Sequence, residues 1–182
     1  MNLNEYKVLN VLKNAKQPVF FRELSKSSGV SIGGTQQVIK NYSKFINKEI
    51  KGRHTYYYFK EDVKTFYLRK IIEIVSAQNF ISENFLFSDF FNYFIKNNIP
   101  CIIFGSYAKG RFSKNSDIDI FVLSTGKVPE HLCPVDVHLI ALSKAQFENV
   151  AKKRETLIKE ISDNHIIIEG VDYFMRWLNE KS

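Results

Sequence analysis

The sequence predicts an α+β protein, and three observations support this prediction. Helical periodicity extends over most of residues 1–45 and again over 61–98, while three short β-rich runs fall between residues 101 and 141. The chain has 182 residues, of which 45% are hydrophobic, which is enough for two small domains with real cores. We expect an N-terminal domain at 1–60, a helical connector at 61–98 and a C-terminal domain at 99–182.

The N-terminal domain is predicted to contain three helices followed by a hairpin. Pro18 ends the first helix, Gly29 is placed to cap the C-terminus of the second, and Ser31 is placed to cap the N-terminus of the third. A β-rich run interrupted by Lys51-Gly52-Arg53 predicts the hairpin. In chain order we expect helices at 3–15, 20–28 and 31–45, and the hairpin at 50–59. This order of elements resembles a winged helix-turn-helix domain.

Positive charge is concentrated in the same part of the chain. Residues 1–60 hold 11 Lys and Arg against 3 Asp and Glu, a net charge of +8, whereas residues 61–182 have a net charge of −1. This asymmetry indicates that one end of the chain meets a polyanion. The winged-helix resemblance implies a DNA interface on the third helix and the wing, at Lys40, Lys44, Lys48, Lys51 and Arg53. Winged-helix domains also serve as protein-docking or dimerisation modules, and the sequence does not separate these roles.

Helices and short strands alternate in the rest of the chain. The helical connector is expected to break near 79–84 and to end at Pro100. Beyond it we expect strands at 101–105, 117–123, 135–141 and 165–168, and helices at 144–163 and 171–180.

Three acidic residues in this C-terminal part indicate a metal site. Asp117 and Asp119 are two positions apart in a predicted strand, so both side chains point to one face of the sheet. Two adjacent carboxylates repel each other unless cations neutralise them, and Mg²⁺ prefers oxygen ligands that it shares with phosphates. Asp136, in the next predicted strand, completes a set that suits a two-metal cluster.

A phosphate-binding turn precedes these carboxylates in the chain. Gly105 and Ser106 follow a predicted strand, and ten residues separate Ser106 from Asp117. Backbone N–H groups in such a turn bind phosphate oxygens, and glycine permits close approach of the backbone. Lys109 and Arg111 are placed to neutralise a triphosphate. Ser116 joins the candidate nucleotide-binding residues, although a local hydrogen bond at the strand entry is its more ordinary role.

The order Gly-Ser, spacer, Asp-x-Asp and later Asp resembles the DNA polymerase β nucleotidyltransferase superfamily, and within it the minimal nucleotidyltransferase group. The resemblance covers residues 99–180 and implies a small α/β domain with a mixed sheet. It implies transfer of a nucleoside monophosphate, AMP from ATP being expected, to an acceptor hydroxyl, with two Mg²⁺ ions. Asp117 and Asp119 then bind both ions, while Asp136 binds one and helps to take the acceptor proton. Members of the minimal group pair with small helical toxin partners and modify them as antitoxins.

A second function of a different class also fits the sequence. A DNA-binding transcriptional regulator would use the basic N-terminal domain on DNA and the C-terminal domain as a nucleotide sensor. The three carboxylates favour the enzyme, and the positive charge of the first 60 residues keeps the regulator as an alternative. Cys101 and Cys133 form no CxxC or Cys/His cluster, so neither a disulfide framework nor a zinc site is expected. With no apolar run of about 18 residues and no signal-peptide core, we expect a cytoplasmic protein without a membrane partner.

Overall fold

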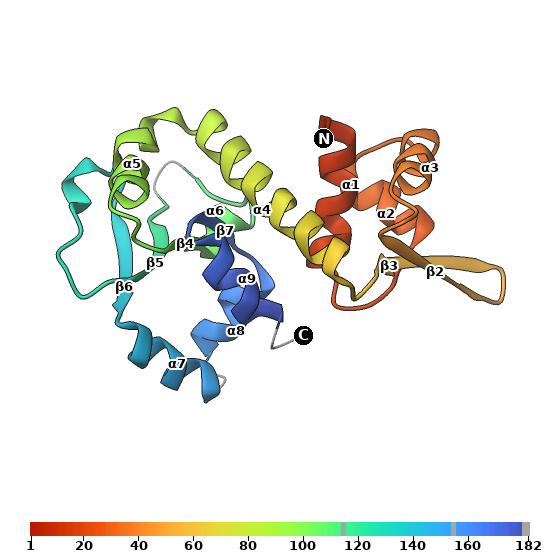
Figure 1. Cartoon of the computed structure of the whole chain (residues 1–182). Helices are drawn as coiled ribbons and strands as arrows, with labels where there is room; N and C mark the ends of the chain where they lie inside the picture. Colours follow the sequence, from red (N-terminus) through yellow and green to blue (C-terminus); the bar gives the residue numbers. More distant parts are fainter. Residues whose placement is uncertain (114–115, 154–155, 180–182) are drawn as a thin grey trace. The chain divides into compact units, whose positions relative to one another are not determined.

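A computed structural model describes residues 1–113, 116–153 and 156–179 of the chain. The chain divides into two compact units, Met1–Ile72 and Glu73–Ser182 (Figure 1). The boundary between them falls inside one helix, α4, which begins at Val63 and ends at Glu83. Each unit has a hydrophobic core and a sheet of its own.

The first unit contains the three helices and the hairpin expected from the sequence, together with one further short strand. Its elements are α1 (Leu3–Asn14), β1 (Val19–Phe20), α2 (Phe21–Ser28), α3 (Ile32–Asn41), β2 (Ile46–Lys51), β3 (His54–Phe59) and the first half of α4. The third helix ends at Asn41 rather than near Phe45, because the chain turns there and enters β2 four residues earlier than predicted.

Local side-chain signals set the helix ends in this unit. The Asn2 side chain accepts a hydrogen bond from the backbone N–H of Glu5, while the Glu5 carboxylate accepts one from the backbone N–H of Asn2, forming a capping box at the start of α1. Gly29 ends α2 with a φ of 65°, and Ser31 accepts a hydrogen bond from the N–H of Gly34 at the start of α3. The predicted capping roles of Gly29 and Ser31 are therefore confirmed.

The hairpin pairs with β1 to form a small antiparallel sheet. The strand order is β1-β3-β2, and Val19 and Phe20 lie opposite Tyr57 and Tyr56. A strand of two residues leaves no periodic signal in the sequence, which is why β1 was not predicted. The side chains buried between this sheet and the helices come from α1, α2, α3, both hairpin strands and α4, and they include Val8, Leu9, Leu24, Val38, Ile46, Phe59 and Ile72.

The second unit is built on a four-stranded sheet with short helices around it. Its elements are the rest of α4, η1 (Phe85–Phe87), α5 (Ser88–Lys96), β4 (Cys101–Phe104), α6 (Gly105–Ala108), β5 (Ile118–Leu123), η2 (Glu130–Leu132), β6 (Val137–Leu142), α7 (Lys144–Lys152), α8 (Thr156–Asp163), β7 (Ile166–Glu169) and α9 (Val171–Asn179). The single helix expected at 144–163 is two helices, α7 and α8, and residues 154–155 lie outside the described residues.

The sheet of the second unit is mixed, as the family resemblance implied. Its strand order is β6-β5-β4-β7, and β4 pairs antiparallel with both β5 and β7. Only the β5–β6 pair is parallel among the described strands, with Ile118 opposite Val137 and Asp119 opposite His138. Because parallel neighbours start at the same edge of a sheet, the segments that lead into β5 and β6 lie side by side.

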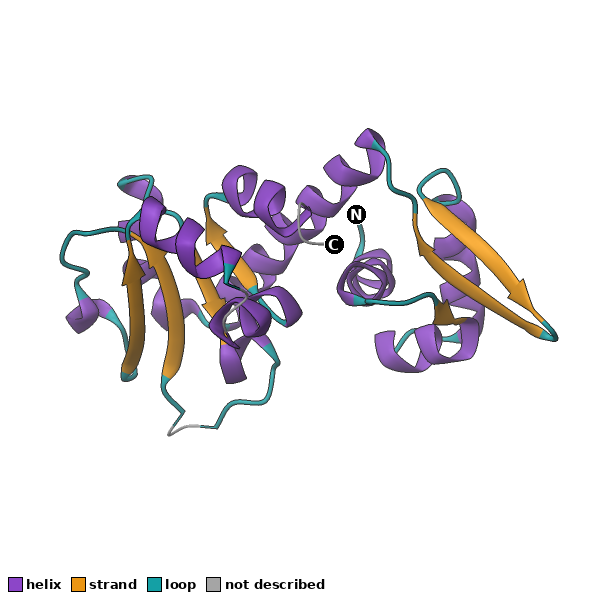
Figure 2. Ribbon diagram, turned by 90° about the horizontal axis from the view of Figure 1, so that it is seen from below, coloured by secondary structure: helices purple, strands orange, loops and turns teal. Residues whose placement is uncertain are grey.

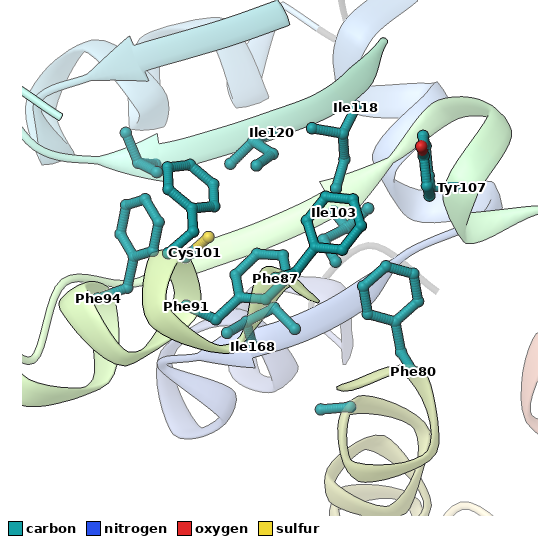
Figure 3. Close-up of a cluster of buried hydrophobic side chains, with 13 residues drawn as sticks. Phe80, Phe87, Phe91, Phe94, Cys101, Ile103, Tyr107, Ile118, Ile120 and Ile168 are labelled. Carbon is teal, nitrogen blue, oxygen red and sulfur yellow. The ribbon is translucent and has the colours of Figure 1, made fainter. Parts of the chain in front are cut away.

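Side chains from helices pack on both faces of this sheet. Ile118, Ile120 and Val122 alternate along β5 and join one core cluster with the phenylalanines of α5 (Figure 3). Phe121 points to the opposite face, where its ring lies 5.1 Å from that of Phe147 in α7 and 6.2 Å from that of Phe174 in α9. In Figure 2 the orange strands of this sheet are accordingly flanked by purple helices.

The helical segment predicted as a connector contributes much of the first of these cores. It breaks at Asn84, inside the predicted interval, and continues through η1 into α5. Its buried side chains, Ala77, Phe80, Phe87, Phe90, Phe91 and Phe94, belong to the same cluster as the central strands. Residues 73–98 thus form part of the second unit's core. None of the helices in the described part of the chain has the length and apolar character that crossing a bilayer requires.

We expect Phe91→Ala to lower the free energy of unfolding of the second unit by about 3–5 kcal/mol, because a fully buried aromatic ring is removed. Urea unfolding followed by fluorescence tests this, since the one tryptophan, Trp177, is buried in the same unit. Phe85→Ala is the matched control, because Phe85 is 71% exposed, and its cost should stay below about 0.5 kcal/mol. Equal losses in the two variants would contradict this account of the core.

Candidate active site

The predicted phosphate-binding turn lies at the end of the buried strand β4. All four residues of β4 are buried, and the chain turns at once into the four-residue helix α6, which starts at Gly105. Gly105 has a φ of 67°, in the left-handed region that residues with a Cβ rarely adopt. The backbone conformation therefore requires glycine at this position.

The same glycine is in direct contact with a predicted catalytic carboxylate. Antiparallel pairing of β4 with β5 places Phe104 opposite Asp119, so the turn begins beside the Asp119 side chain. A Cβ added at Gly105 would clash with Oδ2 of Asp119 and lie 2.8 Å from its Cγ. The Gly-Ser turn and the Asp-x-Asp segment are thus packed together, which explains why glycine is needed here for space as well as for φ.

The three predicted metal ligands lie at the start of two neighbouring parallel strands. Asp117 comes just before β5, Asp119 is its second residue, and Asp136 comes just before β6. The backbone N–H of Ile118 donates to the carbonyl of Asp136 at 2.9 Å, which joins the two strand starts. By strand alternation, Asp117, Asp119 and Asp136 project on one face of the sheet. Asp117 and Asp136 are exposed, and Asp119 is half-buried.

His138 pairs with the middle carboxylate. It lies opposite Asp119 in the parallel register, and its Nδ1 is 2.9 Å from Asp119 Oδ1. A carboxylate oxygen accepts, so Nδ1 is the donor. The His138 side chain is 62% exposed, against 26% for Asp119. The spacing of two residues puts His138 on the same strand face as Asp136, whereas its contact with Asp119 depends on the register between β5 and β6.

The donor chemistry of this edge suits Mg²⁺, although the side chains do not converge as they lie. Three carboxylates at adjoining strand starts offer the oxygen ligands that this cation prefers. Among the residues that the structure describes, no three His, Cys, Asp or Glu side chains are grouped closely enough to hold a metal ion. One Asp119 oxygen is engaged by His138 and the other is packed on Gly105. The residues fit the cation by chemical type and by their place at adjoining strand starts.

The predicted phosphate-binding cations differ in their surroundings. Lys109 Nζ donates to Glu160 Oε1 of α8 at 3.0 Å, in a pair whose two side chains are about 40% exposed. An exposed ion pair of this kind contributes about 0–1 kcal/mol, so an anionic ligand competes with it readily. Arg111 is exposed, and its backbone N–H donates to the carbonyl of Ser106 at 3.0 Å, which keeps the two residues close in space. Lys109 and Glu160 are 51 positions apart in the chain, so nothing in the local sequence predicts their contact.

Aromatic and hydroxyl side chains fill the segment between the turn and Asp117. The buried ring of Tyr107 stacks on the exposed ring of Phe112, with centroids 4.1 Å apart and planes at 9°. Burial chiefly, then Cys133 and Asp117, raises the pKa of Tyr107, so its hydroxyl stays protonated at neutral pH and donates to the carbonyl of Ser116 at 3.4 Å. Ser116 Oγ accepts from the N–H of Ser113 at 2.9 Å, the local role expected at a strand entry. Residues 114 and 115 lie outside the described residues.

The five predicted DNA-binding residues are all exposed on one continuous stretch of the first unit. Lys40 is near the end of α3, Lys44 is in the following turn, and Lys48, Lys51 and Arg53 are in β2 and the hairpin turn. Lys51 forms an ion pair with Glu49 at 3.2 Å, and its Nζ lies 5.7 Å from the centre of the Tyr56 ring.

A protein-family model matches part of the second unit. Residues 89–173 match the nucleotidyltransferase domain. The match begins in α5, includes β4, the Gly105–Ser106 turn and all three carboxylates, and ends in α9. It supports the nucleotidyltransferase superfamily for this part of the chain, and with it the transfer of nucleotidyl groups. Comparison with curated proteins and with solved structures gives no match.

We expect Gly105→Ala to destabilise the second unit more than Gly110→Ala. Both glycines have a positive φ, 67° and 63°, so both substitutions carry a backbone cost of about 1–2 kcal/mol. A Cβ at Gly110 meets nothing within 4 Å, whereas at Gly105 it meets Asp119, which should add about 1–3 kcal/mol. Urea unfolding of both variants measures the difference, and equal values would show that the packing of Asp119 on Gly105 is unimportant for stability.

Proposed function

We propose that the second unit is a Mg²⁺-dependent enzyme that transfers a nucleoside monophosphate from a nucleoside triphosphate, ATP in the first instance, to an acceptor hydroxyl. The acceptor oxygen bonds to the α-phosphorus as the bond to the β-phosphate breaks, and pyrophosphate leaves. The observation that carries the proposal is the packing of the Gly105 turn on Asp119, within a segment that matches the nucleotidyltransferase domain. This contact brings a phosphate-binding turn and a carboxylate set to one edge of the sheet. Both parts are needed for phosphoryl chemistry, which depends mainly on positioning and on charge stabilisation.

Asp117, Asp119 and Asp136 hold the metal in this proposal, with two ions in the full complex. Bound Mg²⁺ neutralises phosphate charge and polarises the oxygens that attack and leave. Asp136 is exposed at the start of β6, where an acceptor hydroxyl can reach it, and we assign it the acceptor proton. A carboxylate in hydrogen-bond reach of a hydroxyl is a suitable general base.

The turn after β4 and the cations that follow it hold the triphosphate. Gly105 allows close approach of the backbone, and Ser106 supplies a hydroxyl donor. Arg111 is exposed beside Ser106, so it is the cation best placed to join them. Lys109 binds the triphosphate once its ion pair with Glu160 is broken. Ser116 acts through Ser113 and Tyr107, which shape the segment before Asp117.

A protein hydroxyl is the first acceptor to test. The motif resembles the minimal nucleotidyltransferase group, which includes antitoxins that modify small helical toxin partners. A protein acceptor and a nucleic-acid acceptor are distinguished by where the label appears when the enzyme is incubated with a cell lysate and α-labelled ATP.

We expect Asp119→Asn to reduce transfer of label from α-labelled ATP by on the order of 100-fold or more, because a charge that holds the cation is removed without a change of shape. The assay contains purified protein, Mg²⁺ and lysate, and gel analysis before and after nuclease or protease treatment identifies the acceptor. Asp89→Asn, an exposed carboxylate of α5 outside the predicted site, is the control and should retain full transfer. Undiminished transfer by Asp119→Asn would refute the assignment.

For the first unit we propose a winged helix-turn-helix that binds DNA. Three helices followed by a hairpin, the tight turn at Gly29 between α2 and α3, and a β1-β3-β2 sheet support this proposal. The exposed basic residues lie on α3, the turn after it and the hairpin, where such a domain meets phosphates. They also favour a second function for the whole protein, a transcriptional regulator that senses nucleotide. Absence of label from all four nucleoside triphosphates, together with specific DNA binding, would favour the regulator over the enzyme.

We expect Lys48→Gln combined with Arg53→Gln to weaken binding to duplex DNA and to lower the slope of log affinity against log salt by about 2, one unit for each phosphate that is no longer neutralised. Fluorescence anisotropy at several salt concentrations measures both quantities. Lys7→Gln with Lys64→Gln removes the same charge from exposed positions on α1 and α4 and is the control. Equal effects of the two double variants would show that the hairpin residues are only a solvated charged surface.

A further inference from the structure

We propose that His138 is a positioning residue that holds the Asp119 carboxylate by a hydrogen bond to Oδ1 and competes with the metal for that oxygen. This inference rests on the proposed function, because it concerns the metal site of that function. It concerns a different residue from the three carboxylates, and its test measures metal binding in place of turnover.

The two oxygens of Asp119 have different surroundings. Oδ2 lies against the backbone of Gly105, so close that a Cβ there would overlap it. Oδ1 faces His138, whose Nδ1 donates to it at 2.9 Å. The Gly105 contact follows from the antiparallel β4–β5 register, in which Phe104 is opposite Asp119, so Oδ2 is confined by the backbone. Oδ1 is therefore the oxygen that an incoming cation reaches first.

Of the two contacts of the Asp119 carboxylate, the one with His138 can be broken without moving the backbone. Its side chain is 62% exposed and stands on β6, an edge strand of the sheet, so the imidazole can rotate into solvent without disturbing the core. Asp119 is only 26% exposed and lies between the two neighbours. Release of Asp119 Oδ1 thus requires only the rotation of one exposed side chain, and the backbone stays in place. Asp117 and Asp136 lie at the adjoining strand starts, where the backbone N–H of Ile118 donates to the carbonyl of Asp136.

The effect of this competition on metal affinity can be predicted. An exposed pair between a carboxylate and a nitrogen donor shifts an equilibrium by a factor of about two to five. Removal of the His138 donor should therefore tighten metal binding by that factor. A residue that instead served as a metal ligand would weaken binding when removed, so the sign of the change separates the two roles.

The test uses two substitutions of nearly equal shape. In His138→Asn the side-chain nitrogen is attached to Cγ, as Nδ1 of histidine is, so a donor to Asp119 is kept. In His138→Leu a methyl group replaces that nitrogen and the donor is removed. Mn²⁺ alone serves as the probe, and calorimetric titration of the full chain without nucleotide gives the dissociation constant. His131→Ala, an exposed histidine of η2 outside the site, is the control.

We expect His138→Leu to bind Mn²⁺ about two- to five-fold more tightly than the unsubstituted protein, and His138→Asn and His131→Ala to bind it equally well. Equal or weaker binding by His138→Leu overturns the role of His138 and leaves the proposed function standing, provided that the unsubstituted protein binds Mn²⁺. No binding by either protein at millimolar Mn²⁺ overturns this inference together with the metal-dependent function. Fluorescence of Trp177 verifies that each variant is folded.

Discussion

The packing of the Asp119 carboxylate on the backbone of Gly105 is the constraint that shapes the candidate site. Antiparallel pairing of β4 with β5 brings the two residues together, and the left-handed turn at Gly105 sends the chain into α6 directly beside the carboxylate. Any side chain at Gly105 would separate the strand that carries the acid from the turn that carries Ser106. The two parts of the motif therefore meet because β4 ends where its antiparallel neighbour β5 begins.

The location of the site follows from where the apolar pattern of the central strands stops. β4 is buried along its whole length, and β5 is buried from Ile118 onward except for the half-buried Asp119 and Leu123. Asp117 and Asp136 come one residue before their strands begin and remain exposed. Charged groups at the solvated edge of a sheet avoid the high cost of burying unpaired charge. A stable sheet and a polar edge coexist because the residues change from exposed and charged to buried and apolar where the strands begin.

The two units differ in how charge is distributed over them. The basic excess of the chain lies within residues 1–60, and the remainder is close to neutral. In the second unit, by contrast, Lys109 forms an ion pair with Glu160, and Asp119 accepts a hydrogen bond from His138. The excess positive charge is thus concentrated in the first unit, whereas Lys109 and Asp119 have side-chain partners within the second.

Most of the helices and strands of this protein, and the identity of its candidate site residues, could be predicted from the amino-acid sequence. Helical periodicity, the caps at Gly29 and Ser31, and the Gly-Ser and Asp-x-Asp segments are local signals, so they can be found along the chain. The strand β1, the pairing of Lys109 with Glu160 and the contact of His138 with Asp119 became visible only in the folded chain. Each joins residues between 19 and 51 positions apart, and such contacts depend on strand register and helix packing.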